Sequence, residues 1–307
     1  MGKGCPSPGG CCGSQGPRVR TDREQRKTIL AFGLDAGVQL GISSFTYTWA
    51  IGVPGYEPAR PLTAVDLLER AAELGVRVVQ VADNLPLHRL SAEALGHVVG
   101  RAAELGIAVE IGTRGIGPRH LATYLDLAER VGSPILRVVV DTAEHQPSED
   151  EIVETVREAL PELEHRGLTL AVENHDRFAA SELARMMEQI GSAHIGICFD
   201  TVNCFGASEG PQAALAVLLP WVVNLHVKDY AVRRVDHAMG FVIEGRPAGR
   251  GQLDISWLLE RVRLQAPAAN AILELWTPPE ETVEATVEKE RAWAEESVRY
   301  LRQLVRD

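Results

Sequence analysis

The chain has 307 residues, of which 45% are hydrophobic and 24% charged, as expected of a globular protein with a substantial core. Its formal net charge of −11 opposes binding to the phosphate backbone of nucleic acids, and no apolar run approaches the roughly 20 residues of a membrane helix. We therefore expect neither nucleic acid nor a membrane as a partner. The first residues lack the apolar core of a signal peptide, which predicts a cytoplasmic protein.

The first 36 residues differ in composition from the rest of the chain. They are rich in Gly and Pro, contain Cys5, Cys11 and Cys12, and then become basic. Such a composition buries too little apolar surface to fold, and the cysteine spacing matches no zinc motif. We predict a disordered tail over residues 1–36 and one folded domain over residues 37–307.

A repeated unit runs through the folded part: a helical pattern ends in a glycine, and a short apolar strand follows. The two most similar copies are residues 70–76 and 101–107, where the glycine is suited to the left-handed conformation that ends a helix. Strands are predicted at residues 38–42, 78–81, 108–111, 136–140, 168–172, 195–199, 222–225 and 271–273. Helical patterns between them include residues 64–74, 149–165 and 283–304.

Eight strands that alternate with helices, without a second block of different composition, predict a single (β/α)8 TIM barrel. A doubly wound open sheet is the alternative, but it gives no reason for polar residues at so many successive strand ends. The unit between His226 and Glu274 is the longest and contains an insertion rich in glycine. Within it, residues 241–243 followed by 244–246 predict a small hairpin at the mouth of the barrel, in a position suited to a lid.

Four metal-compatible residues occupy corresponding positions at the ends of four successive apolar strands. They are Glu173, Asp200, His226 and Glu274, and we refer to them as the quartet. Any one of them could simply cap a strand, but the four together predict a metal site. Carboxylate oxygens with one imidazole nitrogen suit Mn²⁺, Mg²⁺ or Co²⁺ better than a structural zinc site, and Zn²⁺ stays open as a further candidate.

The sequence around the quartet carries a family resemblance. The motifs are Val172-Glu173-Asn174-His175-Asp176, Cys198-Phe199-Asp200-Thr201, Leu225-His226-Val227-Lys228-Asp229, Leu273-Glu274-Leu275-Trp276 and the loop Gly249-Arg250-Gly251-Gln252-Leu253-Asp254. Over about residues 38–304 the chain resembles the xylose isomerase-like barrel superfamily, which contains ketose 3-epimerases, hydroxypyruvate isomerase and inosose-processing enzymes. The resemblance implies that the quartet binds one divalent cation and that Glu173 and Glu274 are also the catalytic acid/base pair.

The activity implied by the resemblance is that of a metal-dependent isomerase or epimerase of a keto-sugar or related polyol. Such an enzyme removes a proton next to a carbonyl, and a cation stabilises the resulting enediolate. A lyase or dehydratase of a keto-inositol or 3-keto-glycoside uses the same parts and stays open. A DNA-repair endonuclease fits an acidic chain poorly, and the intact quartet disfavours a silent binding barrel. The expected partner is a small-molecule sugar or polyol, and a homo-oligomer stays open.

Two positions depart from the ketose 3-epimerase pattern and concern the substrate. Asn203 stands where those enzymes usually have histidine, and Lys228-Asp229 stands where they tend to have Glu and Arg. Because Lys228 shares a strand face with His226, we predict that its ammonium contacts the substrate rather than the metal; an ion pair with Asp229 or another acid is the alternative. The residues predicted to bind substrate are Lys228, His175, Asn203, Arg114, Trp49, Asn84 and His88.

Overall fold

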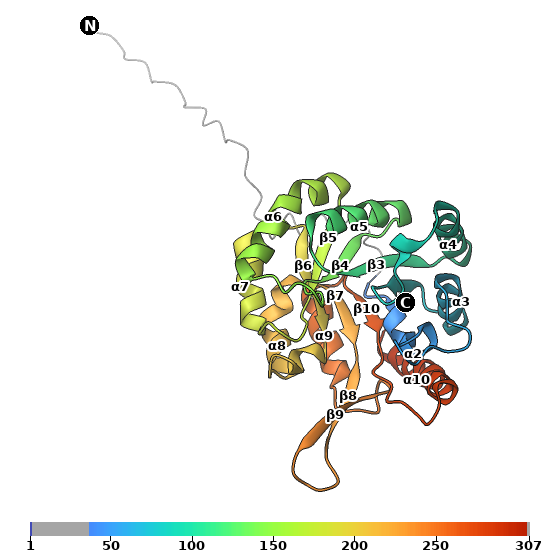
Figure 1. The fold of residues 1–307 in the computed structure, drawn as a ribbon. Coiled ribbons are helices and arrows are strands. Elements are labelled where there is room, and N and C mark those ends of the chain that lie inside the picture. The colour runs from blue at the N-terminus through green and yellow to red at the C-terminus, as the bar shows by residue number, and fades with distance from the viewer. Residues whose placement is uncertain (2–36, 306–307) are drawn as a thin grey trace.

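The barrel predicted from the strand pattern is present. The structure, a computed structural model, describes Met1 and residues 37–305. Eight parallel strands close in the order β1-β10-β7-β6-β5-β4-β3-β2, and helices surround them (Figure 1). This closure confirms the single (β/α)8 barrel over the open sheet. Apart from Met1, the predicted tail lies outside the described residues.

The predicted elements agree closely with the observed ones. The barrel strands are β1 (Leu40–Ser43), β2 (Val78–Val81), β3 (Ala108–Arg114), β4 (Ile135–Val139), β5 (Thr169–Glu173), β6 (Ile195–Asp200), β7 (Val222–Val227) and β10 (Asn270–Leu273). The α-helices are α2 (Thr48–Ile51), α3 (Ala64–Leu74), α4 (Ala92–Leu105), α5 (Pro118–Val131), α6 (Glu149–Arg166), α7 (Ala180–Ile190), α8 (Pro211–Leu218), α9 (Ile255–Gln265) and α10 (Val283–Leu304). Several strands extend one or two residues beyond the predicted apolar runs, because polar site residues continue the ladder.

The repeated helix–glycine–strand unit has the predicted local structure. Gly75 ends α3 with φ 69° and Gly106 ends α4 with φ 65°, both in the left-handed region. Each glycine donates its backbone N–H to carbonyls of the last helical turn, so that the chain reverses without leaving polar groups unpaired. The strand begins within a few residues, which places successive strands in parallel register.

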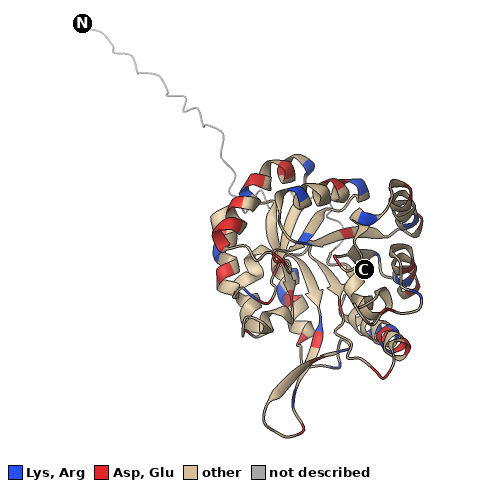
Figure 2. Ribbon diagram, viewed as in Figure 1, with Lys and Arg blue, Asp and Glu red and all other residues tan. Residues whose placement is uncertain are grey.

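Charged side chains are distributed unequally between the helices and the barrel. Figure 2 shows them mainly on the surrounding helices, whereas the strands are mostly uncharged. The exceptions are buried ionisable residues on barrel strands, among them Glu110, Arg137, Glu173, Asp200 and His226. Because an unpaired buried charge is costly, such a concentration needs compensating partners. None of the described helices combines the length and apolar character needed to cross a membrane.

The insertion after β7 forms a hairpin, but over different residues than predicted. β8 (Asp229–Arg234) pairs antiparallel with β9 (Phe241–Arg246), and the hairpin projects from the barrel (Figure 1). The prediction that residues 241–246 form a hairpin by themselves is wrong, because they are a single strand. Gly245 does not mark a turn: a Cβ there would lie 1.9 Å from the backbone oxygen of Trp276. The glycine allows the base of the hairpin to pack against the chain that follows β10.

The glycine-rich loop before α9 closes around the side chain of Asp229. The carboxylate accepts backbone N–H hydrogen bonds from Gly249 and Gly251, both at 2.9 Å, and from Leu253 at 3.1 Å. A Cβ on Gly251 would lie 2.1 Å from Asp229 Oδ1, so only glycine fits this approach. Asp229 therefore anchors the loop and is not the ion-pair partner of Lys228.

We expect Asp229→Asn to lower the free energy of unfolding by about 1–3 kcal/mol, measured by urea denaturation. The amide replaces one acceptor oxygen with an NH₂ group that faces backbone donors. The matched control is Asp236→Asn, at a fully exposed position in the hairpin turn, which should change stability by less than about 0.5 kcal/mol. Equal effects at both positions would contradict the anchoring role of Asp229.

Candidate functional site

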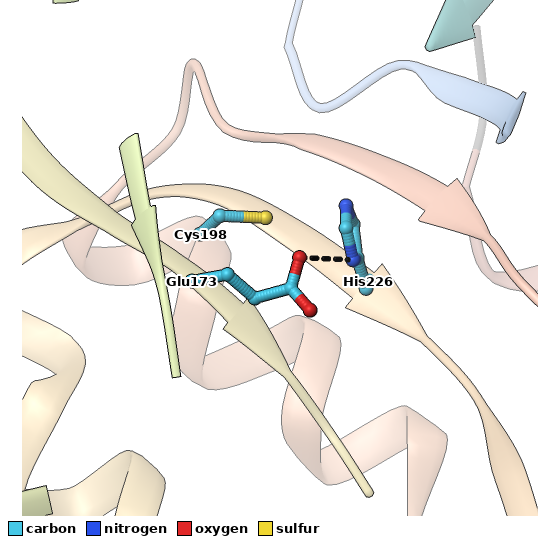
Figure 3. Close-up of side chains that lie close together, drawn as sticks. All are labelled: Glu173, Cys198 and His226. Carbon is cyan, nitrogen blue, oxygen red and sulfur yellow. Dashed lines mark ion pairs between the residues drawn. The ribbon is translucent and has the colours of Figure 1, made fainter. Parts of the chain in front are cut away.

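The quartet converges inside the barrel at the carboxyl ends of its strands. Glu173, Asp200 and His226 lie on β5, β6 and β7, and Glu274 directly follows β10. His226 Nδ1 lies 3.3 Å from Glu173 Oε2 and 3.5 Å from both Asp200 Oδ2 and Glu274 Oε1. Figure 3 shows the Glu173 carboxylate directed at the His226 ring, with Cys198 beside them. The four residues predicted from separate strand ends are thus close neighbours, and each is at most 2% exposed.

Several atoms of the quartet are buried without a hydrogen bond. His226 Nδ1 and Glu274 Oε1 have no hydrogen-bond partner, and Asp200 Oδ2 and Glu274 Oε2 are approached by the Lys228 ammonium, at 2.7 and 2.8 Å. Buried polar atoms in native proteins almost always have a partner, and an uncompensated carboxylate is especially costly. These atoms point to a common centre, and three carboxylates with one imidazole nitrogen form a donor set that suits a divalent cation. The residues present therefore fit such an ion.

Asp200 is oriented by the backbone around it. Its Oδ1 accepts hydrogen bonds from the N–H groups of Val202 at 2.9 Å and Asn203 at 3.1 Å. Asn174 pairs with the Asp200 backbone, accepting its N–H at 2.6 Å and donating to its carbonyl at 2.9 Å. One carboxylate oxygen is thereby used by the fold, and the other is directed to the quartet.

Glu173 is held on both sides of its carboxylate. Arg137 on β4 donates its Nε–H to Glu173 Oε2 and also pairs with Asp83, Nη1 to Oδ1 at 2.9 Å. Asn203, predicted to bind substrate, donates its amide to Glu173 Oε1 at 2.7 Å. Burial opposes the charge of Arg137, but Glu173 and Asp83 outweigh it and raise the pKa of Arg137. Glu173 is therefore held in one orientation with both oxygens engaged.

Lys228 contributes a second buried cation to the site. Its Nζ lies 2.7 Å from Asp200 Oδ2 and 2.8 Å from Glu274 Oε2, as ion pairs. Burial works against the charge, but the two carboxylates outweigh it and raise the pKa of Lys228 well above its usual value. From the sequence, either Asp229 or another acid is the alternative ion-pair partner of Lys228. The structure excludes Asp229 and shows Asp200 and Glu274 as the partners. Contact between Lys228 and substrate stays a prediction.

Cys198 lies beside Glu173 and His226, with the ligand atoms of the three side chains within 4.8 Å of one another. Burial raises the pKa of its thiol to about 11, which keeps the sulfur protonated at neutral pH. The thiol donates to Asn224 Oδ1 at 3.5 Å. This agrees with the interpretation of Cys198 as an ordinary reduced thiol.

A cavity of about 450 Å³ opens next to Lys228, within the size range of small-molecule sites. Its walls are mainly apolar and aromatic and are formed by Phe45, Thr48, Trp49, Val53, Ile243, Glu244, Gly245, Leu275, Trp276, Thr277 and Pro278. The base of the β8–β9 hairpin forms one wall, as its predicted position at the barrel mouth implied. Trp49 and Lys228, two of the predicted substrate residues, both line this cavity.

Three predicted substrate residues lie around Asp83 and Ser44: Asn84 follows β2, Arg114 ends β3 and His175 follows β5. Arg114 Nη2 lies 3.3 Å from His175 Nε2, and Arg114 Nε lies 3.4 Å from Asp83 Oδ2. Asn84 is engaged by Ser44, whose hydroxyl donates to Asn84 Oδ1 at 2.5 Å. Arg114 and His175 are thus linked through Asp83 to Arg137 and Glu173. Their contact with a substrate stays a prediction.

His88 lies apart from these residues. Its Nδ1 is 2.7 Å from the Tyr124 hydroxyl, and it lines a separate hollow of about 200 Å³ with Leu87, Leu90 and Asp126 among others. It is predicted to lie near the site only because it follows β2 in the sequence. The structure does not bring it to the cavity beside Lys228.

Two residues that support the site were not singled out from sequence. Gln80 Oε1 lies 2.7 Å from His226 Nε2, and Glu110 lies 3.0 Å from the Gln80 amide nitrogen. Both are fully or almost fully buried on apolar strands. The available signal was their position: each is a single polar residue inside an apolar strand, at the inward phase of its alternation.

The wall of the cavity is tied to α10 through Glu290. Its carboxylate accepts the backbone N–H groups of Trp49 and Ala50, each at 3.0 Å. The Trp49 indole N–H donates to the Thr277 carbonyl at 2.9 Å. Burial raises the pKa of Glu290 to about 8, against the opposing effect of the backbone donors.

We expect Glu290 to make stability depend on pH. Because its folded-state pKa of about 8 lies above the value of roughly 4.3 in an unfolded chain, its contribution is present below about pH 4 and is lost as the pH rises through 8. The difference in unfolding free energy between wild type and Glu290→Gln should therefore shift against the wild type between about pH 5 and 9, by at most about 1.4 kcal/mol per pH unit.

Urea denaturation at several pH values measures this difference. The control is Glu288→Gln, on the same helix at an exposed position paired with Arg291, and it should give a nearly constant difference over that range. A constant difference for Glu290→Gln as well would contradict the pH dependence.

The comparisons with known proteins assign the family. The family model described as xylose isomerase-like TIM barrel matches residues 68–304, and the chain belongs to this family. Among curated proteins it is similar to 3-oxo-isoapionate decarboxylase of Pectobacterium atrosepticum, with 33% identity over 264 residues that cover 85% of this chain and 94% of that protein. The resemblance inferred from the strand-end motifs is confirmed.

Solved structures show the same fold at low sequence identity. D-psicose 3-epimerase from Clostridium cellulolyticum, solved with D-tagatose, has a TM-score of 0.66 and 15% identity, covering 87% of this chain and 99% of its own. A xylose isomerase-like TIM barrel protein from Mycobacterium smegmatis, solved with magnesium, has a TM-score of 0.63 and 16% identity, covering 86% and 97%. Enzymes of this family thus include a decarboxylase and epimerases.

Proposed function

We propose that this protein is a divalent-metal-dependent lyase that removes CO₂ from a 3-oxo sugar acid. The observation that carries the proposal is the position of Lys228, which lines the cavity and pairs with two acids of the quartet. The similarity to a 3-oxo-isoapionate decarboxylase over nearly the whole length of that protein supports the substrate class.

The quartet would hold the cation. When bound, a divalent cation supplies electrostatic stabilisation of the negative charge that develops on a substrate oxygen. Mn²⁺, Mg²⁺ and Co²⁺ all suit the donor set, and Zn²⁺ stays a further candidate. Arg137 and Asn203 hold the Glu173 carboxylate in place beside this centre.

Loss of CO₂ from a 3-oxo acid requires no base at the start and a proton donor at the end. The bond to the carboxylate carbon breaks, its electron pair forms an enolate with the neighbouring ketone, and the enolate carbon then takes up a proton. Lys228 is the cationic group on the wall of the cavity, and its ammonium supplies that proton. The Trp276 ring lines the same cavity, with its centroid 5.8 Å from Lys228 Nζ.

The two glutamates are less suited to proton abstraction. Both oxygens of Glu173 are engaged by cationic or amide donors. The Lys228 ammonium lies 2.8 Å from Glu274 Oε2 and engages the second carboxylate. Carboxylates already engaged by cationic or amide donors are weak bases, and this arrangement favours a reaction that begins without proton removal.

The isomerase or epimerase of a keto-sugar predicted from sequence is the second candidate. It is favoured by the placement of Glu173 and Glu274 on either side of His226, within 3.3 Å and 3.5 Å of the same nitrogen. An acid/base pair that works on two faces of one carbon needs two carboxylates close to one centre. The two candidates share an enolate-type intermediate and differ in whether carbon is lost.

The test is to incubate the protein with Mn²⁺ and a panel of 3-oxo sugar acids, keto-sugars and keto-inositols in D₂O. Release of ¹³CO₂ from labelled acid, with one deuterium on the carbon that carried the carboxylate, supports the lyase. Solvent deuterium in a keto-sugar without loss of carbon supports the second candidate instead. Turnover of neither class by the metal-loaded protein would contradict both.

We expect Lys228→Met to lower kcat/KM by 10-fold or more while the metal content is unchanged. The variant removes a charge-assisted hydrogen bond worth roughly 1.5–3 kcal/mol and the proposed proton donor, but no ligand. Steady-state kinetics and elemental analysis measure the two effects. Lys289→Met is the control, because Lys289 pairs with Glu280 near the surface; a Lys228 variant with kinetics equal to it would contradict the role of Lys228.

Glu173→Gln separates the two candidate functions. In an isomerase that uses Glu173 as its base, the amide should abolish solvent deuterium exchange, because it keeps an oxygen ligand but cannot carry the proton. In the lyase we expect measurable CO₂ release to remain, reduced through weaker orientation of the site. Metal content is measured alongside, and a variant that binds metal but releases no CO₂ would count against the lyase.

A further inference from the structure

The barrel interior next to the quartet contains a closed network of amides around one carboxylate. Glu110 on β3 lies at its centre. Its Oε2 accepts from Gln80 Nε2 and Asn224 Nδ2, each at 3.0 Å, and its Oε1 accepts from Asn270 Nδ2 at 2.7 Å. The network lies toward the amino ends of the strands, two residues below His226 on β7. None of its members belongs to the quartet.

The donors and acceptors of this network permit one orientation of the Gln80 amide. Three amide nitrogens lie within hydrogen-bond distance of the two Glu110 oxygens, so each neighbouring amide turns its NH₂ group toward Glu110. The second N–H of Gln80 donates to Asn224 Oδ1 at 3.1 Å. The remaining polar atom of Gln80 is its oxygen, which lies 2.7 Å from His226 Nε2. A flipped Gln80 amide would set its oxygen against oxygens of both Glu110 and Asn224.

An oxygen acceptor at Nε2 determines which nitrogen of His226 carries the hydrogen. Nε2 must be the donor, and Nδ1 is then the nitrogen that offers its lone pair to a ligand. Nδ1 is the atom surrounded by the three carboxylates of the quartet. A hydrogen bond to the distal ring nitrogen is the usual means by which a protein fixes a metal-binding histidine.

We propose that Gln80 and Glu110 are positioning residues that hold His226 as its Nε2–H tautomer and so present Nδ1 to a divalent cation. The inference rests on the metal site of the proposed function and adds the residues that prepare it. Glu110 acts at one remove: it orients the Gln80 amide, and the Gln80 oxygen orients the ring. The relay is fully enclosed, since Gln80 and His226 are 0% exposed and Glu110 is 2% exposed.

The first experiment compares two variants of the network by titration calorimetry with Mn²⁺. Gln80→Leu removes the acceptor for Nε2–H, and we expect Mn²⁺ affinity to fall by about 10- to 100-fold. Asn270→Leu is the matched control, because Asn270 contacts Glu110 but neither Gln80 nor His226. It should keep the affinity within about 3-fold of wild type, although both variants lose a hydrogen bond to Glu110. Thermal unfolding of the metal-free proteins confirms that each is folded.

The second experiment exchanges the two groups. Gln80→Glu/Glu110→Gln places the carboxylate next to His226, where it accepts from Nε2–H, and the amide at position 110 donates to it. We expect this double variant to recover Mn²⁺ affinity to within about 5-fold of wild type, because the tautomer is again fixed. A merely structural role of the network would not predict recovery by exchange.

The tautomer itself is observed by NMR of the wild-type protein labelled with ¹⁵N-histidine and loaded with Mg²⁺. The chain has nine histidines, and the His226 signals are assigned by their loss in His226→Gln. An Nε2–H signal with an unprotonated Nδ1 supports the proposal, and an Nδ1–H signal overturns it. This measurement carries the test even if Gln80→Leu does not fold.

The outcomes separate this inference from the proposed function. If the wild type binds neither Mn²⁺ nor Mg²⁺, the metal site is wrong and the inference falls with it. If the wild type binds Mn²⁺ and Gln80→Leu binds it equally well, the metal site stands and the positioning role is overturned.

Discussion

The structure depends on burying several carboxylates close to one another, away from solvent. Three carboxylates of the quartet surround one imidazole in the barrel interior, where their mutual repulsion and lost hydration are costly. The fold offsets this with buried cations on two sides, Arg137 next to Glu173 and Lys228 between the other two acids. Glu274 Oε1, which still lacks a hydrogen bond, makes the centre receptive to a further positive charge.

The barrel brings these charged side chains together and leaves them little conformational freedom. Parallel strands in register bring residues from distant parts of the chain to one level, so each side chain needs only a short, buried path to the centre. The irregular segments around the mouth are fixed by carboxylates that accept backbone N–H groups: Asp229 holds the loop before α9, and Glu290 holds the segment that carries Trp49. Rigid walls of this kind preserve the shape of a site built partly on loops.

The fold and the quartet were predictable from the sequence because their signals are local. Apolar runs that end in a polar residue and glycines that end helices depend on neighbours within one turn or one strand. The partners of these residues depend on contacts across the barrel. Gln80 and Glu110 meet His226 only through the closed register, Asn203 reaches Glu173 through a short 3₁₀ turn, and His88 follows a site strand yet turns toward a neighbouring helix.

The chemistry open to the quartet depends on the residues that surround it. The same donor set can stabilise charge on a substrate oxygen whether the reaction begins by removing a proton or by releasing CO₂. What differs is the freedom of the acids to act as bases. Here Arg137, Asn203 and Lys228 engage those acids, while the ammonium of Lys228 also borders the cavity. Cations that weaken a carboxylate as a base favour a reaction in which the protein donates a proton rather than removing one. The placement of Lys228 is the part of this site that similarity to epimerases does not explain.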